Sequence, residues 1–149
     1  MMYSGFLDND KRHGQGIEYS IHGELCFDGL WDLDSRVQGR EFYKGGHLKY
    51  DGQWKGLQKH GRGVKYDYAG NIERDGEWVS DNFQGRGTEY YKNGQIKYQG
   101  IYRILFCCLN IKSGTWNGGL KDGKGSFWYE NGNLYYKGTW SKDVRDGKG

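Results

Sequence analysis

The sequence contains no proline, only three cysteines and no long hydrophobic run. Cys107 and Cys108 are adjacent and Cys26 is distant, so the chain lacks a disulfide framework and the paired spacing of a zinc site. This cysteine usage favours a reducing, intracellular setting. The longest apolar run, Ile104 to Leu109, is far shorter than the roughly 20 residues of a membrane-spanning helix.

An excess of charge of one sign is also lacking. The chain has 22 basic and 19 acidic side chains and a formal net charge of +3, which does not favour nucleic acid as a partner. It is rich instead in glycine, with 27 residues, and in aromatic residues, which make up 17%. We therefore expect glycines to mark turns at regular intervals and aromatic rings to form the core.

Most glycines occupy three positions that recur in a fixed order, usually every 24 residues, as from Gly52 to Gly76. The first position lies in an aromatic-x-Gly-x-Trp pattern, the second opens a Gly-x-Gly pattern, and the third is a turn glycine. The first set is Gly5, Gly29, Gly52, Gly76, Gly100 and Gly138, the second Gly14, Gly39, Gly61, Gly85, Gly123 and Gly147, and the third Gly23, Gly46, Gly70, Gly94 and Gly132. Glu41 replaces the second glycine of one Gly-x-Gly pattern, which predicts an altered loop there.

Side chains between these glycines alternate with a period of two. Apolar residues stand two, four and eight positions after the turn glycines, as at Ile96 and Tyr98, with Arg74 as the exception, and the intervening positions are mostly polar. This period is typical of strands with one apolar face and excludes a helix. A further aromatic residue stands four positions before each turn glycine. We expect Trp54, Trp78 and Tyr66 to lie on one common face.

The turns indicate how the strands are joined. Asn93-Gly94 and Asn131-Gly132 predict two-residue hairpin turns of type I′, and at the opposite end of each hairpin we expect a loop of about five residues. The first-position glycine lies inside a strand, where its missing side chain would leave room for a Trp or Tyr ring to lie across the backbone. The predicted fold is all-β, an elongated antiparallel meander of successive β-hairpins in a single layer.

The segments Tyr50-Asp51-Gly52-Gln53-Trp54-Lys55-Gly56 and His60-Gly61-Arg62-Gly63 resemble MORN repeats (membrane occupation and recognition nexus). The resemblance covers residues 1–149 as about six units, of which the first and last are incomplete. It implies a twisted single-layer sheet with an aromatic groove that serves as a scaffold or docking surface. The chain departs from the family pattern in its period and at Leu33, Ser80 and Lys142, which leaves the loop shape open.

Residues 101–114 interrupt the repeat. Most of them are apolar or tyrosine, none is acidic, and their removal would join Gly100 to Thr115 and restore the period. Three interpretations remain open: an inserted loop, a hydrophobic anchor for a partner or membrane, and a retained intron. The chain stops just after a Gly-x-Gly pattern, so we expect it to be part of a longer chain or to have its open sheet edge covered by another subunit.

No catalytic or metal-binding cluster is evident. His13 and His60 hold the same repeat position a full hairpin apart, and the Gly-x-Gly copies lack the Lys-Ser/Thr and the helix of a P-loop. We therefore predict no catalytic residue, cofactor or metal, and expect that the chain is not an enzyme. Basic side chains gather around Gly-x-Gly, among acidic ones: Lys11, Arg12, Lys59, Arg62, Arg86, Lys121, Lys124, Arg145 and Lys148.

The leading hypothesis is a non-catalytic repeat scaffold that docks a protein partner along an aromatic groove, in a cytoskeletal, ciliary or membrane-linked assembly. Contiguous apolar patches usually mark interaction sites. The predicted groove consists of Tyr19, Trp31, Phe42, Tyr50, Trp54, Tyr66, Trp78, Tyr90, Tyr98, Trp128, Tyr136 and Trp140.

Four other interpretations stay open. The first is the regulatory repeat segment of a larger enzyme of the lipid kinase or histone methyltransferase type, and the second is a direct binder of anionic phospholipid. The third is a module that self-associates through its open sheet edge. The fourth is an inert support whose rings only pack together. The expected location is intracellular, either cytoplasmic or associated with the cytoskeleton or a membrane.

Overall fold

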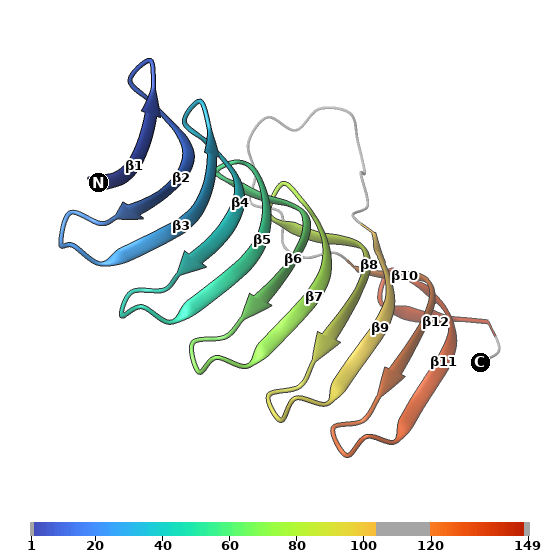
Figure 1. The fold of residues 1–149 in the computed structure, drawn as a ribbon. Coiled ribbons are helices and arrows are strands. Elements are labelled where there is room, and N and C mark those ends of the chain that lie inside the picture. Colours follow the sequence, from blue (N-terminus) through green and yellow to red (C-terminus); the bar gives the residue numbers. More distant parts are fainter. Residues whose placement is uncertain (1, 104–119, 148–149) are drawn as a thin grey trace.

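The computed structural model describes residues 2–103 and 120–147. They form one antiparallel sheet whose twelve strands follow one another in chain order (Figure 1). The strands are β1 (Met2–Asp8), β2 (Lys11–Tyr19), β3 (Leu25–Asp32), β4 (Ser35–Phe42), β5 (Leu48–Gly56), β6 (Gln58–Tyr66), β7 (Ile72–Val79), β8 (Asn82–Tyr90), β9 (Ile96–Arg103), β10 (Leu120–Trp128), β11 (Leu134–Ser141) and β12 (Val144–Asp146). The prediction of an all-β, single-layer meander of hairpins is confirmed.

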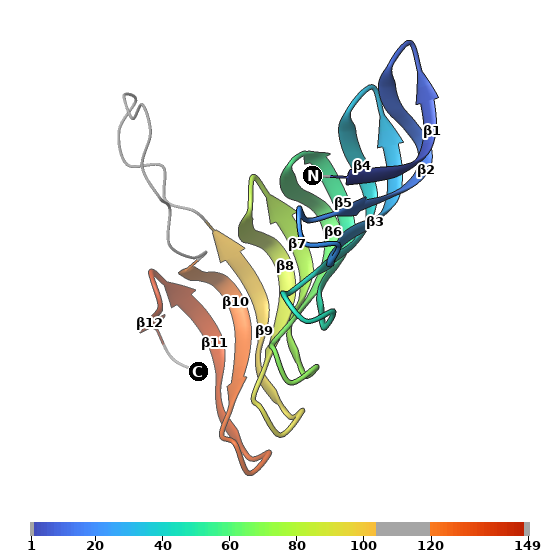
Figure 2. The same ribbon diagram turned by 90° about the vertical axis from the view of Figure 1, so that its left-hand side faces the viewer.

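The strands are bowed, and the hairpins stack side by side into an elongated, twisted ribbon (Figures 1 and 2). Each strand pairs only with its neighbours in the sequence. Among the described residues, no second layer of secondary structure packs on either face of the sheet. Every structural unit therefore contacts mainly the units before and after it, as in other repeat proteins.

The loops at the turn glycines hold three residues rather than two. The N–H of Gly94 donates to the carbonyl of Tyr91 at 2.9 Å, and the N–H of Tyr91 donates to the carbonyl of Gln95 at 2.8 Å. Only the glycine of this loop has a positive φ, 82°. The predicted type I′ turns at Asn93-Gly94 and Asn131-Gly132 are therefore wrong. A three-residue loop places one left-handed glycine after an ordinary turn and leaves the asparagine right-handed.

The type I′ geometry lies at the opposite end of the hairpins. Ser80 and Asp81 both have positive φ, 48° and 67°, as do Leu33 and Asp34, with 44° and 71°. The expected five-residue loops are therefore two-residue turns. A left-handed leucine costs about 1–2 kcal/mol relative to glycine, and Gly56 occupies the equivalent position between β5 and β6.

An aspartate in three of these turns binds the preceding hairpin and offsets the strained backbone. The N–H of Asp34 donates to the carbonyl of Arg12 at 3.0 Å, and its Oδ1 accepts from the Arg12 N–H at 3.0 Å and Nε at 2.9 Å. These bonds, the backbone one first, lower the pKa of Asp34. Asp81 and Asp143 bind Lys59 and Lys121 in the same way.

The repeat from Gly29 to Gly52 is one residue shorter than the usual 24, and the pairing of its strands shows why. Gly39 pairs with both Gly29 and Gly52, which is the place that Gly63 takes in the next unit, so Gly39 is the second glycine of its pattern and Val37 replaces the first. The assignment of Glu41 to the second glycine position is therefore wrong. The register shift in β4 contains fewer unpaired residues than the one in β6, which shortens this repeat by one residue without changing its two-residue turn.

The predicted insert begins inside a strand. Ile101 and Tyr102 continue β9 and pair with Arg86 and Gly85 of β8. The remaining residues of the insert, 104–114, lie outside the described residues. Whether the insert belongs to the mature protein stays an open prediction.

Candidate functional site

The strands β1 to β11 each contribute one glycine to a continuous row across the sheet, which we call the glycine row. Each member is the Cα partner of the glycine on the next strand. The row consists of Gly5, Gly16, Gly29, Gly39, Gly52, Gly63, Gly76, Gly87, Gly100, Gly125 and Gly138. We call the face toward which a Cβ atom at these positions would point the inner face, and the opposite one the outer face.

Aromatic rings fill the space that the glycine row leaves on the inner face. A Cβ atom at Gly63 would overlap the ring and hydroxyl of Tyr50, and one at Gly125 would overlap Tyr98. The Phe27 ring lies in the same way against Gly39. The prediction concerned the first-position glycines, and it is confirmed at Gly100 and Gly138, where a Cβ atom would overlap the rings of Tyr98 and Tyr136.

The strands bend sharply at the glycine row. Phe27 and Trp31 are four residues apart, which is about 13 Å in an extended strand, yet their ring centroids are 5.2 Å apart. The rings of Tyr50 and Trp54 are 5.1 Å apart. The bend at Gly29 and its equivalents therefore makes the inner face concave and closes two rings of each strand over the glycine between them.

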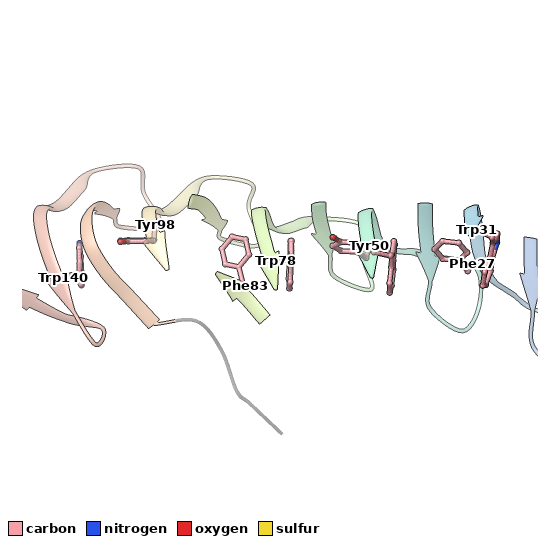
Figure 3. Packing of buried hydrophobic residues seen from close by; sticks show 8 residues of the cluster. Phe27, Trp31, Tyr50, Trp78, Phe83, Tyr98 and Trp140 are labelled. Carbon is pink, nitrogen blue, oxygen red and sulfur yellow. The ribbon is translucent and has the colours of Figure 1, made fainter. Parts of the chain in front are cut away.

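Rings also join each hairpin to the next. Trp54 contacts Phe27 of the preceding hairpin edge to face, with centroids 5.6 Å apart, and Trp78 contacts Tyr50 at the same distance. The indole Nε1 of Trp78 donates to the carbonyl of Gly63 at 2.9 Å, and Trp31, Trp54 and Trp140 donate to Gly16, Gly39 and Gly125. Aromatic contacts of this kind contribute about 0.5–1.5 kcal/mol each beyond their buried area. Figure 3 shows the buried rings in one line through the hairpins. With the partly buried Tyr136, they form what we call the ring ladder: Phe27, Trp31, Tyr50, Trp54, Trp78, Phe83, Tyr98, Tyr136 and Trp140.

Cations cover the concave side of the ring ladder. The Cζ atom of Arg12 lies 4.1 Å from the Trp31 ring centroid, and Lys59 Nζ lies 5.4 Å from that of Trp54. Partly desolvated contacts between a cation and a ring face are favourable. We call these residues the cation row, and it consists of Arg12, Arg36, Lys59, Lys121 and Arg145.

Carboxylates among the cations balance their charge. Glu18, with 2% of its surface exposed, accepts from Arg36 Nη2 at 2.7 Å, and Arg12 lies 3.8 Å away. Glu41 lies 3.4 Å from Lys59. Because removal of one partner leaves a buried charge unpaired, these pairs hold the cation row in place over the rings.

One unit exchanges the two kinds of side chain. Arg74 has the offset from its turn glycine at which other units carry a ring, and Phe83 pairs with Trp78 where other units carry a cation. The Phe83 ring lies on Gly87 of the glycine row, and Arg74 lies 5.5 Å above that ring and 3.5 Å from Glu89. The arrangement of glycine, ring, cation and carboxylate is therefore preserved although the residues that supply it change places.

The ring ladder contains seven of the twelve predicted groove residues, and it is not an open groove. Six of them are buried, and Tyr136 is partly buried against them: Trp31, Tyr50, Trp54, Trp78, Tyr98 and Trp140. The predicted groove is therefore closed at these rings, because the strand bend and the cation row cover them.

The other five predicted groove residues lie on the outer face. Tyr66 directly follows Lys65, which pairs with the inner-face residue Tyr50, and successive side chains of a strand point to opposite faces. Burial raises the pKa of Tyr66, and the nearby carboxylates of Asp51 and Asp75 raise it further. Each of these two aspartates also directly follows an inner-face residue and therefore lies on the outer face. The same parity holds for the whole set, which we call the outer rings: Tyr19, Phe42, Tyr66, Tyr90 and Trp128.

The prediction that one face carries all twelve rings is therefore wrong. The outer rings are half-buried, so they remain accessible. Their role in partner binding, like that of the inner set, stays a prediction.

Two core rings were missed by the sequence analysis. Phe27 has the same offset from its turn glycine as Tyr50, so a signal for it was present. Phe83 has the offset of a cation, and only its pairing with Trp78 shows its place. The cation row was visible as basic residues near Gly-x-Gly, but its position over the rings was not.

Other chemistry finds little support in the part of the chain that the structure describes. No group of three His, Cys, Asp or Glu side chains there could hold a metal ion. His13 Nδ1 in β2 lies 3.3 Å from Asp32 Oδ1 in β3. His60 lies in β6, in another hairpin, so the two histidines do not belong to one site. None of the described segments is a helix with the length and apolar character needed to cross a bilayer.

The comparison with protein families agrees with this architecture. The MORN repeat model matches residues 3–21, 50–72, 75–96, 113–134 and 136–149. The unmatched residues 22–49 include β3 and β4, where Val37 replaces the first glycine, and they form the same hairpin. A search of curated proteins finds no match. MORN repeats form a repeat-type module that binds proteins or associates with membranes, and this chain belongs to the MORN repeat family.

Proposed function

We propose that this chain is a non-catalytic repeat scaffold that binds an elongated protein partner along its outer rings, in an intracellular assembly linked to the cytoskeleton, a cilium or a membrane. The mechanism is binding alone. The outer rings support it better than the ring ladder does, since a partner can reach half-buried side chains but not buried ones.

The observation that carries the proposal is a pair of hollows at equivalent places in successive hairpins. One, of about 310 Å³, is lined by Ile72 and by Tyr90 of the following hairpin, together with charged side chains of both signs such as Glu73 and Lys97. The other, of about 390 Å³, is lined by Ile96 and Trp128. A partner could pack an apolar side chain against the aromatic ring of each hollow and place polar groups against the charged lining of the first. Aromatic residues in such places commonly supply much of the binding energy.

Affinity capture with quantitative mass spectrometry tests the proposal. The variant Tyr90→Glu/Trp128→Glu places charge in both hollows, and the control Tyr68→Glu/Tyr129→Glu changes two exposed tyrosines at loop tips. We expect the first variant to lose the partners that the wild type and the control retain. If the Tyr90→Glu/Trp128→Glu variant has an unchanged circular dichroism spectrum and still recovers the same partners, the proposal is wrong.

A further inference from the structure

The outer face carries a hollow of about 440 Å³ that is separate from the outer rings. It follows the glycine row across β7, β8 and β9, where the backbone of Gly76, Gly87 and Gly100 forms its floor, since side chains at these positions would point to the inner face. Polar and basic side chains form its walls, among them Arg62, Arg86, Thr88, Gln99 and Lys124.

Three cations at this hollow are free to meet an external anion. Arg62, Arg86 and Lys124 each stand directly before a member of the glycine row, so their side chains point to the outer face. All three are exposed, and among the described residues none of their side chains forms a salt bridge; Glu77, which pairs with Arg62 across the sheet, accepts a hydrogen bond from the backbone N–H of Arg86 at 3.2 Å instead. Arg40, nearer the N-terminus on the same face, is by contrast 2.7 Å from Asp28. We call the three residues the cation ladder.

The spacing of the cation ladder suggests the conformation of its ligand. Its members lie on alternate strands, β6, β8 and β10, and two strand spacings amount to about 9.6 Å. A polyproline II helix has three residues per turn and rises about 3.1 Å per residue, so every third side chain points the same way at intervals of about 9.3 Å. A peptide in this conformation, laid along the glycine row, would match one carboxylate to each cation.

We propose that the cation ladder binds an acidic segment of a partner protein in the polyproline II conformation, with a carboxylate at every third residue. Thr88 and Gln99 line the hollow between the cations and can bond the peptide backbone, which has no internal hydrogen bonds in this conformation. Asp75, also at the hollow, selects against carboxylates placed out of step with the ladder. The ladder and the outer rings share no residue, so either proposal can fail alone.

Fluorescence anisotropy with labelled peptides tests the inference. Two proline-rich peptides of identical composition carry glutamate either at every third position or in one block. Each is titrated with the wild type, with Arg62→Gln/Arg86→Gln/Lys124→Gln, and with the control Lys44→Gln/Lys92→Gln/Lys142→Gln, which removes as much charge from loops and turns. We expect the spaced peptide to bind the wild type more tightly than the block peptide. Its affinity should fall about tenfold in the ladder variant and stay unchanged in the control.

Equal binding of the spaced peptide to the ladder variant and the wild type would overturn the inference, and so would equal binding of the two peptides to the wild type. Circular dichroism checks that the variant folds, as expected for three exposed side chains outside the core. Vesicles of phosphatidylcholine and phosphatidylserine give a further arm. If the ladder variant loses vesicle binding while peptide binding is the same in both proteins, the ligand is a lipid headgroup and the peptide inference is wrong.

Discussion

Gly63 lies beneath the ring of Tyr50, so the backbone there has room for a ring and for no further atom. We expect Gly63→Ala to lower the free energy of unfolding by about 2–3 kcal/mol, because the added methyl group overpacks a buried site. Gly70→Ala is the control, since Gly70 has a φ of 90° and open space around it, and it should cost only about 1 kcal/mol from backbone strain. Urea unfolding of both variants measures the difference. Equal losses would show that the ring does not depend on the glycine.

Tyr98 is fully buried, and burial raises the pKa of its hydroxyl to about 12. The unfolded chain ionises this group near pH 10. The neutral hydroxyl therefore contributes stability that is fully present below pH 10 and is lost as the pH rises toward 12. We expect Tyr98→Phe to unfold at a higher pH than the wild type, with circular dichroism as the measurement. An unchanged alkaline midpoint would contradict the assigned burial.

At the scale of the elements, a strand pair is held by a ring on a glycine with a cation above it. The exchange of Arg74 and Phe83 shows that the two side chains can come from either strand. A double-mutant cycle tests this interchange. Arg74→Tyr alone crowds two rings over Gly87, and Phe83→Lys alone leaves the glycine uncovered beside two cations, so each should cost about 2 kcal/mol or more.

The double variant Arg74→Tyr/Phe83→Lys restores the arrangement of the other units. We expect it to be more stable than either single variant, with a coupling energy of about 2 kcal/mol from denaturant unfolding. Additive losses in the double variant would mean that the two positions do not exchange roles.

Much of the element-level structure was predictable from the sequence. The spacing of glycines and apolar residues predicted the hairpins, their order and the rings across the strand glycines. The face of a residue was harder to predict. Tyr66 and Tyr50 are both aromatic and flank neighbouring loops, but a register shift and a three-residue loop change the parity between them and place them on opposite faces. The bend at Gly29, which buries Phe27 and Trp31, leaves no mark on a linear pattern.

At the scale of the whole molecule, the two faces of the sheet differ in the burial of their rings and in the pairing of their charges. The concave face is filled by the ring ladder and closed by cations paired with carboxylates such as Glu18. The outer face keeps half-buried rings and unpaired cations such as Arg86 at regular intervals. Because each hairpin repeats the same contacts with its neighbour, the ribbon holds these groups at regular spacing, as the proposed binding of an elongated partner requires.

The central claim is that the ring ladder is the covered core of the sheet and not a docking groove. Hydrogen–deuterium exchange of the tryptophan indole N–H groups, followed by NMR, tests it most directly. The indole groups of Trp31, Trp54, Trp78 and Trp140 are buried and bonded to carbonyls of the glycine row. We predict that they exchange only when neighbouring hairpins open, as slowly as the backbone amides beside the glycine row. Exchange of these four groups as fast as that of free indole would show an open groove and contradict the account.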